Sequence, residues 1–410
     1  LKLRADKMPE KNTWCKYSTI KFVTIDDKRL ATFHYVFQLC IFLYIVVYQV
    51  IGKLGYADSD QPIGSLRISY QPAMKSGDPN KDVDYQYNFS PLDKLRYCDA
   101  YGKKDDVAPS VLQCLYFGEI STNYPVTGTS PFFVTTRVQE SNQSLVCNSP
   151  PAPGESCNQT YAFGCDEGFT PCYDKKRAAQ RKYFVADVEL GTIMLDHAVQ
   201  SPSDSSLAGD VSTMKGYLKK CDTDEKIMPS KTPGGQDYFT INQLLSAVKT
   251  ESGCGTTLDD VSTVSGSTDS VRYEGTVIII TISYSNAKQW SGIEKTIEYS
   301  YSVTQLKGAK TKSMEAIWTS YPKERVIKNR HGITFTVLQD GQLRSFSAIT
   351  MLTTLTTSLA LLAFATTIVD ALMNYCLKDR ELYRKMKYAE IHVEENQDGT
   401  INYEAIEHSH

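Results

Sequence analysis

A run of threonines in the last apolar segment of this chain has the spacing of a polar helix face. Thr350, Thr353, Thr357 and Ala360 recur at intervals of three and four, so they share one side of an α-helix. Small hydroxylated side chains on one face suit a water-filled pore lined by several copies of the helix. They equally suit hydrogen bonds to carbonyls one turn earlier, or close helix packing. The pattern predicts that Thr353, Thr357 and Ala360 line a pore, and leaves the structural alternative open.

Asp370 lies near the end of the same segment, about 12 Å, or two helical turns, from its boundary. A carboxylate at membrane depth is costly and usually faces water or a partner helix. A role in ion permeation and a structural pairing between helices both fit this position. His34, in the first apolar segment, fits packing against a neighbour.

Enzyme signatures are absent from the sequence. It contains no Gly-rich phosphate loop ending in Gly-Lys, no Gly-x-Ser-x-Gly, no His-Glu-x-x-His and no Cys-x-x-Cys. His197 and His331 are the only histidines between the two apolar segments, and two histidines alone do not make a metal site. We therefore predict no catalytic residue, no metal and no enzyme activity.

Two stretches, residues 32–52 and 345–369, contain no Lys, Arg, Asp or Glu. About 20 apolar helical residues cross a bilayer core of about 30 Å. Basic residues precede the first stretch and follow the second, and such flanks stay in the cytosol. We expect a cytosolic N-terminus (1–31), a first membrane helix (32–54), an extracellular domain (55–344), a second, pore-lining helix (345–377) and a cytosolic tail (378–410).

Cysteines and sequons support an outside location for the central segment. Eight of the 11 cysteines fall there, an even number that suits disulfides in an oxidising compartment, with the pairing left open. They are Cys98, Cys114, Cys147, Cys157, Cys165, Cys172, Cys221 and Cys254. Three sequons, at Asn88, Asn142 and Asn158, also lie in this segment and are predicted glycosylation sites.

The central segment is predicted to be mostly β-structure, since β-branched runs such as residues 271–284 and 297–305 alternate with turn residues. One short helix is expected over residues 242–250. The last 20 residues are acidic and polar, which predicts a disordered tail. Residues 332–338 alternate and lead through Gly341 into the second apolar segment. A strand is therefore expected to run directly into a membrane helix, where it can pull on a pore.

Two ungapped motifs, one at each end of the chain, resemble a known family. One is Tyr17-Ser-Thr-Ile-Lys21, which is similar to a Tyr-x-Thr-x-Lys/Arg signature before a first membrane helix. The other runs from His331-Gly-Ile-Thr-Phe to Tyr375-Cys-Leu-Lys378, and it is similar to the family's second membrane helix and the strand before it. Both belong to the P2X receptors, the ATP-gated purinoceptors. The resemblance implies a homotrimer in the bilayer and a pore for Na⁺, K⁺ and Ca²⁺. Together with the shared helix face, it implies that the closed pore is narrowest along Thr353, Thr357 and Ala360. It implies ATP as agonist between subunits, with neither a cofactor nor a nucleic-acid partner.

The agonist residues of that family are matched only in part. Its lysine pair falls near Ser69 and Gln71, neither of which is basic. Its phenylalanine–threonine pair is similar to Gly191-Thr192, and its Asn-Phe-Arg triplet to Lys310-Thr311-Lys312. A further lysine falls at Asn329. The resemblance implies a ligand site, for ATP or a related phosphate ligand, made by Lys310 and Lys312 with Lys328 and Arg330 from the same region, Arg67 or Lys75, and Thr192 of the adjacent subunit.

Two other classes share some of these features. An acid-sensing or epithelial-sodium-type channel also has two helices and a Cys-rich outer domain, but its Gly-x-Ser filter is absent from residues 353–357. A non-conducting adhesion or structural membrane protein explains the altered ligand residues, but not the threonine face or Asp370. The plasma membrane is the favoured location, with an intracellular vacuole membrane as the alternative.

Overall fold

The computed structural model describes most of the 410 residues in two compact units, one formed by Leu1–Asp58 with Phe346–His410 and the other by Ser59–Ser345. The described residues are 28–73, 90–100, 113–124, 128–147, 153, 156, 158–165, 168–172, 179–221, 225–250, 253–377, 380–381, 390–395 and 401–406.

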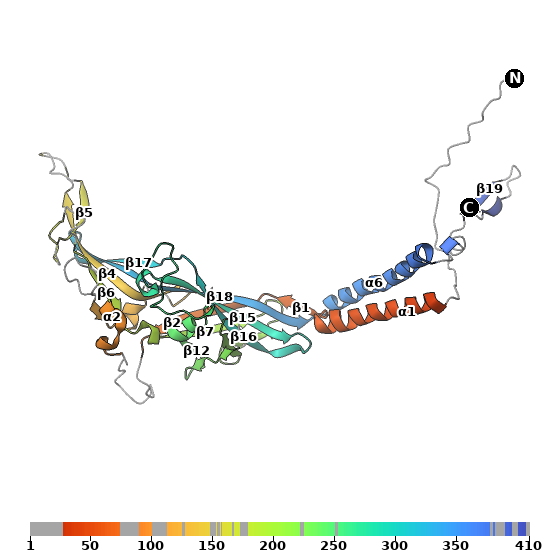
Figure 1. Ribbon diagram of the computed structural model, residues 1–410, viewed down its shortest axis with the longest axis horizontal. Coiled ribbons are helices and arrows are strands. Elements are labelled where there is room, and N and C mark those ends of the chain that lie inside the picture. Colours follow the sequence, from red (N-terminus) through yellow and green to blue (C-terminus); the bar gives the residue numbers. More distant parts are fainter. Residues whose placement is uncertain are drawn as a thin grey trace, which may run out of the picture. The chain divides into compact units, whose positions relative to one another are not determined.

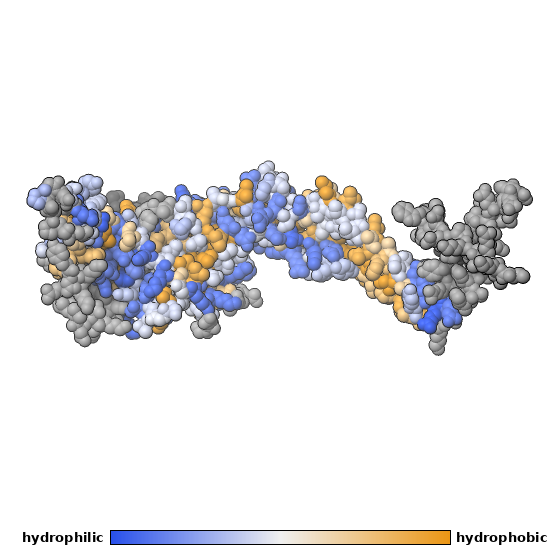
Figure 2. All heavy atoms as spheres, turned by 90° about the horizontal axis from the view of Figure 1, so that it is seen from above, coloured by the Kyte–Doolittle hydropathy of each residue, from blue (hydrophilic) through white to orange (hydrophobic). Residues whose placement is uncertain are grey.

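The first unit contains two long apolar helices that lie side by side (Figure 1). One is α1 (Lys28–Leu43), extended by a π-helical stretch, η2 (Tyr44–Gly52); the other is α6 (Ala348–Tyr375). Lys28–Gly52 and Ala348–Tyr375 are each long and apolar enough to cross a membrane. Hydrophobic residues cover much of the surface of these helices (Figure 2). Ser347 caps α6 by accepting a hydrogen bond from the Thr350 backbone N–H.

The second unit contains a large mixed sheet. Among the described residues it has 13 strands, with β18 between β15 and β4 in the order β10-β9-β16-β15-β18-β4-β6-β3 (Figure 1). These are β10 (Lys226–Ile227), β9 (Lys215–Lys219), β16 (Gly292–Leu306), β15 (Thr276–Lys288), β18 (Glu324–Phe346), β4 (Phe132–Cys147), β6 (Arg181–Val185) and β3 (Gln113–Leu115). Beside them pair β1 (Ala57–Asp60), β5 (Gln159–Phe163), β13 (Lys249–Thr250), β14 (Gly253–Cys254) and β17 (Lys312–Ser320).

A smaller sheet packs against the large one. Its described strands are β11 (Ser230–Lys231), β12 (Asp237–Thr240), β7 (Thr192–Gln200), β2 (Ile63–Gln71) and β8 (Ala208–Asp210). Both sheets alternate buried and exposed residues, and their inner faces share one hydrophobic core that includes Ile193 and Leu195 of β7 and Ile278 and Ile280 of β15. Short helices connect the strands: η3 (Leu92–Lys94), α2 (Arg96–Ala100), α3 (Glu119–Thr122), η4 (Val188–Leu190), α4 (Ile241–Ser246) and α5 (Val271–Glu274).

Three sequence expectations are corrected by these bounds. The strand expected from residue 271 is preceded by α5, because Ser270 caps a helical turn that Gly275 ends at φ 85°. The short helix expected over 242–250 ends at Ser246, since Lys249 and Thr250 pair as β13. The tail expected to be disordered contains an antiparallel pair, β19 (Glu390–Glu395) and β20 (Ile401–Ile406).

Three disulfides join described cysteines: Cys98–Cys114, Cys165–Cys172 and Cys221–Cys254. Cys147 is also disulfide-bonded, and Cys157 lies outside the described residues. Cys40 and Cys376, beside or within the apolar helices, are free. Of the sequon asparagines, Asn158 is exposed, Asn142 lies on β4, and Asn88 lies outside the described residues.

Candidate functional site

Lys312 lies on an exposed position where β17 begins, in register with the centre of the large sheet. Its cross-strand neighbour is His331 of β18, and His331 in turn faces Arg137 of β4. Asn329 is two residues from His331 and therefore shares this face. The buried Oδ1 of Asn329 accepts no hydrogen bond from another described residue, and Lys312 has no carboxylate partner among them. One face thus offers an unneutralised cation beside an unused polar group.

The ring of His331, which is partly buried beside Lys312, is neutral. Burial, followed by the positive charges of Arg137 and Lys312, lowers its pKa to about 4. At neutral pH it therefore adds no charge to the Lys312 face. Lys310, just before β17, pairs with Glu274 at 3.3 Å and is more than half exposed.

Lys328 and Arg330 lie on the opposite face of the same strands. Lys328 is in register with Glu315 of β17 and Glu140 of β4, and its ammonium lies 3.1 Å from the Glu140 carboxylate. Arg330 is only 6% exposed, donating to Glu315 at 2.9 Å and to the Ser121 carbonyl at 2.8 Å. Lys328 and Arg330 therefore project from the face opposite to that of Asn329 and His331, because the two-residue period of β18 sends neighbouring side chains to opposite faces.

Thr192 and Arg67 share a face on the smaller sheet. Thr192 of β7 pairs with Gln71 of β2, and Arg67 of β2 pairs with Asp196 of β7, its guanidinium 2.9 Å from that carboxylate. Ser69, between them on β2, is on the same face. The structure therefore brings together the positions at which the family resemblance places its lysine pair and its threonine. Lys75, the other predicted cation, lies outside the described residues.

Gly191 precedes Thr192 at a position where a neighbouring ring leaves no room for a side chain. A Cβ atom built there would lie 2.4 Å from the ring of Tyr70, which is itself buried on β2. The phenylalanine expected from the resemblance cannot fit while Tyr70 fills that space.

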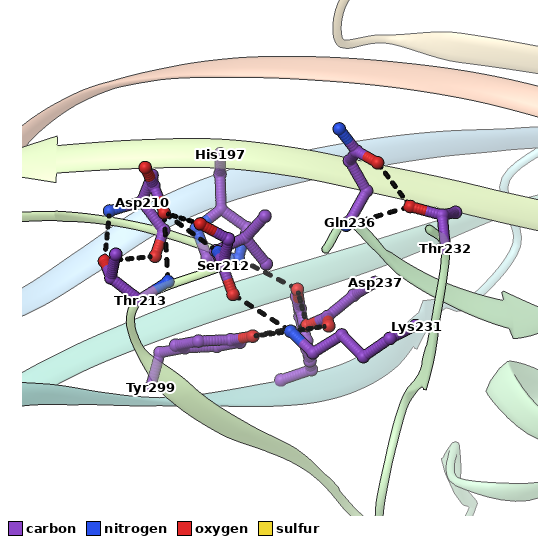
Figure 3. Close-up of polar contacts among 11 residues, drawn as sticks. His197, Asp210, Ser212, Thr213, Lys231, Thr232, Gln236, Asp237 and Tyr299 are labelled. Carbon is purple, nitrogen blue, oxygen red and sulfur yellow. Dashed lines mark hydrogen bonds and ion pairs between the residues drawn. The ribbon is translucent and has the colours of Figure 1, made fainter. Parts of the chain in front are cut away.

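A buried polar network links the smaller sheet to the larger one. His197 of β7 contacts two tyrosine hydroxyls of the large sheet, Tyr301 through Nε2 and Tyr284 through Nδ1, each at 2.9 Å. The Tyr301 hydroxyl donates to Asp237 of β12. The Tyr299 hydroxyl donates to the same carboxylate, which also pairs with Lys231 (Figure 3). Burial and the Lys231 charge lower the pKa of His197 to about 4. The network therefore joins the strand of Thr192 to β16 and to β15, and β15 flanks β18.

The threonines of α6 bond to their own helix. Thr353 donates to the Thr350 carbonyl at 2.9 Å, and Thr357 to the Thr353 and Thr354 carbonyls at 3.0 Å. Within a single subunit, these hydroxyls therefore make the hydrogen bonds to carbonyls of their own helix that the sequence left open as an alternative to a pore. Thr353, Thr357 and Ala360 are nonetheless exposed, whereas Ser358 and Ala365 are buried.

The two sets of residues occupy different sides of α6. At 3.6 residues per turn, the buried Ser358 and Ala365 lie about 120° around the helix from the Thr353 face. A helix that packs on α1 with one side thus keeps the threonine side available for other copies of α6. Asp370 is half-buried on α6 and takes part in an interaction there.

Comparison with known proteins places these features in a family. The family model of the ATP P2X receptor matches residues 157–390. P2X receptor A of Dictyostelium discoideum is 33% identical over 379 residues, which are 91% of this chain and 89% of the relative. P2X receptor D of the same organism is 31% identical, over 92% of this chain and 83% of the relative. The chain belongs to the P2X receptor family.

Among solved structures, a crystal structure of an invertebrate P2X receptor from the Gulf Coast tick, in the presence of ATP and Zn²⁺, is 16% identical. It covers 83% of this chain and 99% of its own, with a TM-score of 0.46. P2X receptors are ATP-gated membrane channels, not enzymes, and ATP is their agonist rather than a cofactor. This member has the two candidate spans and the disulfide-bonded β-rich domain that we predicted.

Proposed function

We propose that the chain is one subunit of a homotrimeric cation channel opened by extracellular ATP or a related phosphate ligand. The observation that carries this proposal is the length of β18. It runs from Glu324 to Phe346 without a break, passes Asn329 and His331 beside Lys312, and ends two residues before α6 begins. A displacement at the Lys312 face is therefore transmitted along one covalent strand to the helix with the threonine face.

The ligand site is shared between neighbouring subunits. Within one chain the Lys312 face and the Thr192 face belong to different sheets, so each is a half-site that a second subunit completes. Lys312 and Lys310 contact the phosphates, because charge-assisted hydrogen bonds to phosphate are about twice as strong as neutral ones. Thr192 meets the base from the other half-site, with Arg67 beside it and Lys75 as a further cation.

Lys328 and Arg330 support this site rather than contact the ligand, because they project from the face of β18 opposite to that of Asn329 and His331. Three copies of α6 line the pore with Thr353, Thr357 and Ala360, and Asp370 faces the permeation path or a neighbouring helix. Both termini lie in the cytosol and residues 55–344 outside it, with Asn88, Asn142 and Asn158 as glycosylation sites. The plasma membrane is favoured over an internal vacuole.

Whole-cell recording with ATP tests this function. Lys312→Ala removes a bond to a charged group of about 1.5–3 kcal/mol. We therefore expect about ten- to a hundredfold weaker agonist potency with normal assembly. Lys219→Ala, at an exposed lysine of β9 with no counterpart in the family site, is the matched control and should change little. Equal effects of the two substitutions on agonist potency would show that Lys312 does not form part of the ligand site.

Two outcomes distinguish the remaining classes. A trimer that reaches the surface but passes no current with ATP or other nucleotides would favour the non-conducting alternative. A dimer or monomer in nanodiscs would contradict the channel itself. Membership of the P2X family already excludes an acid-sensing or epithelial-sodium-type channel.

A further inference from the structure

The turn between β15 and β16 exposes a tryptophan on a strained backbone. β15 ends at Lys288 and β16 begins at Gly292. Trp290, at the tip, has φ of 70° and is 54% exposed. The left-handed conformation costs a residue with a Cβ atom about 1–2 kcal/mol, and glycine or asparagine would avoid most of that cost. A large indole held there in water indicates a role outside the turn.

Strand register shows where this tip points. β15 runs parallel to β18, with Tyr284 opposite Gly341. Asn286 then exchanges two hydrogen bonds with the Arg344 backbone, at 2.8 Å and 2.7 Å. The residues beyond Asn286 therefore project in the direction in which β18 runs toward its C-terminal end.

The chain enters a candidate membrane span close to the same point. α6 begins at Ala348, four residues after Arg344, just as Trp290 is four residues after Asn286. An extended chain covers at most about 3.6 Å per residue. The tip and the first residue of α6 thus each lie within about 15 Å of the Asn286–Arg344 pair.

The charges of the hairpin are balanced. Lys288 lies 3.0 Å from Glu298 and 3.6 Å from Glu294, and Lys295 adds a second cation. Two cations against two carboxylates give no preference for an anionic surface. A neutral indole with one N–H donor instead suits the boundary between phospholipid headgroups and acyl chains, where tryptophan is enriched.

We propose that Trp290 inserts into the headgroup boundary of the membrane leaflet on the side of the β-rich domain, with zwitterionic phospholipid as its partner. The insertion anchors the β15–β16 hairpin, and through Asn286 it fixes the end of β18. The proposal rests on the proposed function only in that α6 crosses the bilayer.

Tryptophan fluorescence of the full chain in nanodiscs tests this assignment, because the chain has three tryptophans, at 14, 290 and 318. Trp14→Phe with Trp318→Phe leaves Trp290 alone. Trp14→Phe with Trp290→Phe leaves Trp318, which is 39% exposed on β17 and serves as the matched control. The two variants are compared in phosphatidylcholine and in acyl-brominated phosphatidylcholine.

The Trp290 receptor should lose about half its emission in brominated lipid, since apolar groups of interfacial segments reach about 5–10 Å into the boundary between headgroups and acyl chains. The Trp318 receptor should change little, and adding phosphatidylserine should not alter the Trp290 quenching. Equal quenching of both variants would overturn the proposal. Blue-shifted but unquenched emission from Trp290 would also overturn it. That result would mean that the indole lies in an apolar environment away from lipid, against a neighbouring subunit. The readout needs no current, so failure of ATP to open the channel counts against the proposed function alone.

Discussion

Mild acid should destabilise the β-rich domain through His197. The hydrogen-bond directions define its protonation: Tyr301 donates to Asp237 and so accepts from Nε2–H, while Tyr284 accepts from Gln339 and donates to Nδ1. Protonating Nδ1 places two donors against each other in a buried site. Neutral His197 is therefore required by the network that joins the two sheets.

The magnitude follows from linkage. The pKa of His197 is about 4 in the folded chain against an ordinary value of 6.5. Because the folded value is the lower one, the stabilisation is present above about pH 6.5 and is lost as the pH falls toward 4. Between pH 7 and pH 5 this costs about 2 kcal/mol. His331, whose pKa is also about 4, loses a similar amount over the same interval.

Thermal unfolding of the purified receptor at pH 7 and pH 5 measures this effect. His197→Gln keeps a donor toward Tyr301 but cannot titrate. Its melting temperature should fall by about 4 °C less between the two pH values than that of the parent chain. His331→Gln should reduce this fall in melting temperature by a comparable amount, and the double variant should lose most of its dependence on pH. A double variant that retains the full acid sensitivity would refute the assignment of both histidines.

Three further outcomes are expected. Cysteine at Thr353 should react with water-soluble thiol reagents and block current, and reaction at Leu355 instead would show that α6 presents its other face to the pore. Gly191→Ala should destabilise the domain by about 1–3 kcal/mol in a melting assay, since its Cβ overlaps the Tyr70 ring; an unchanged melting temperature would mean that the ring moves away freely. Arg272→Ala should cost about 3–5 kcal/mol, because this guanidinium is 1% exposed and bonds two carboxylates; a loss below 1 kcal/mol would contradict that burial.

Much of the architecture was predictable because it depends on patterns local in sequence. Residues 345–369 form an uncharged stretch long enough to cross a membrane, and residues 332–338 alternate with a period of two. Both patterns can be recognised without knowing what these segments pack against. The tail pair β19–β20 runs against its composition, because acidic and polar residues favour disorder whereas the alternation within each strand favours β-structure. In that segment Asp398-Gly399 is a hairpin turn signal between the two alternating runs.

The ligand residues were harder to predict because their partners are distant in sequence. Lys328 and Lys312 are equally basic in the sequence, yet Glu140, 188 residues before Lys328, pairs with only one of them. Because successive side chains of a strand point to opposite faces, the sequence could have placed Lys328 and Arg330 on one face of β18 and Asn329 on the other. No sequence signal could have shown that the Tyr70 ring occupies the space beside Gly191.

The position of β18 also determines when the domain can be completed during synthesis. It is the last strand of the domain to leave the ribosome, yet it lies between β15 and β4. Until it emerges, β15 and β4 each present an open edge that can pair with other chains, and β1 and β17 lack the strand with which they pair. The residues that follow are those of α6. Closure of the sheet and delivery of the second apolar helix to the membrane insertion machinery therefore fall in the same short interval of translation, and chains that stop before Glu324 should be retained and degraded.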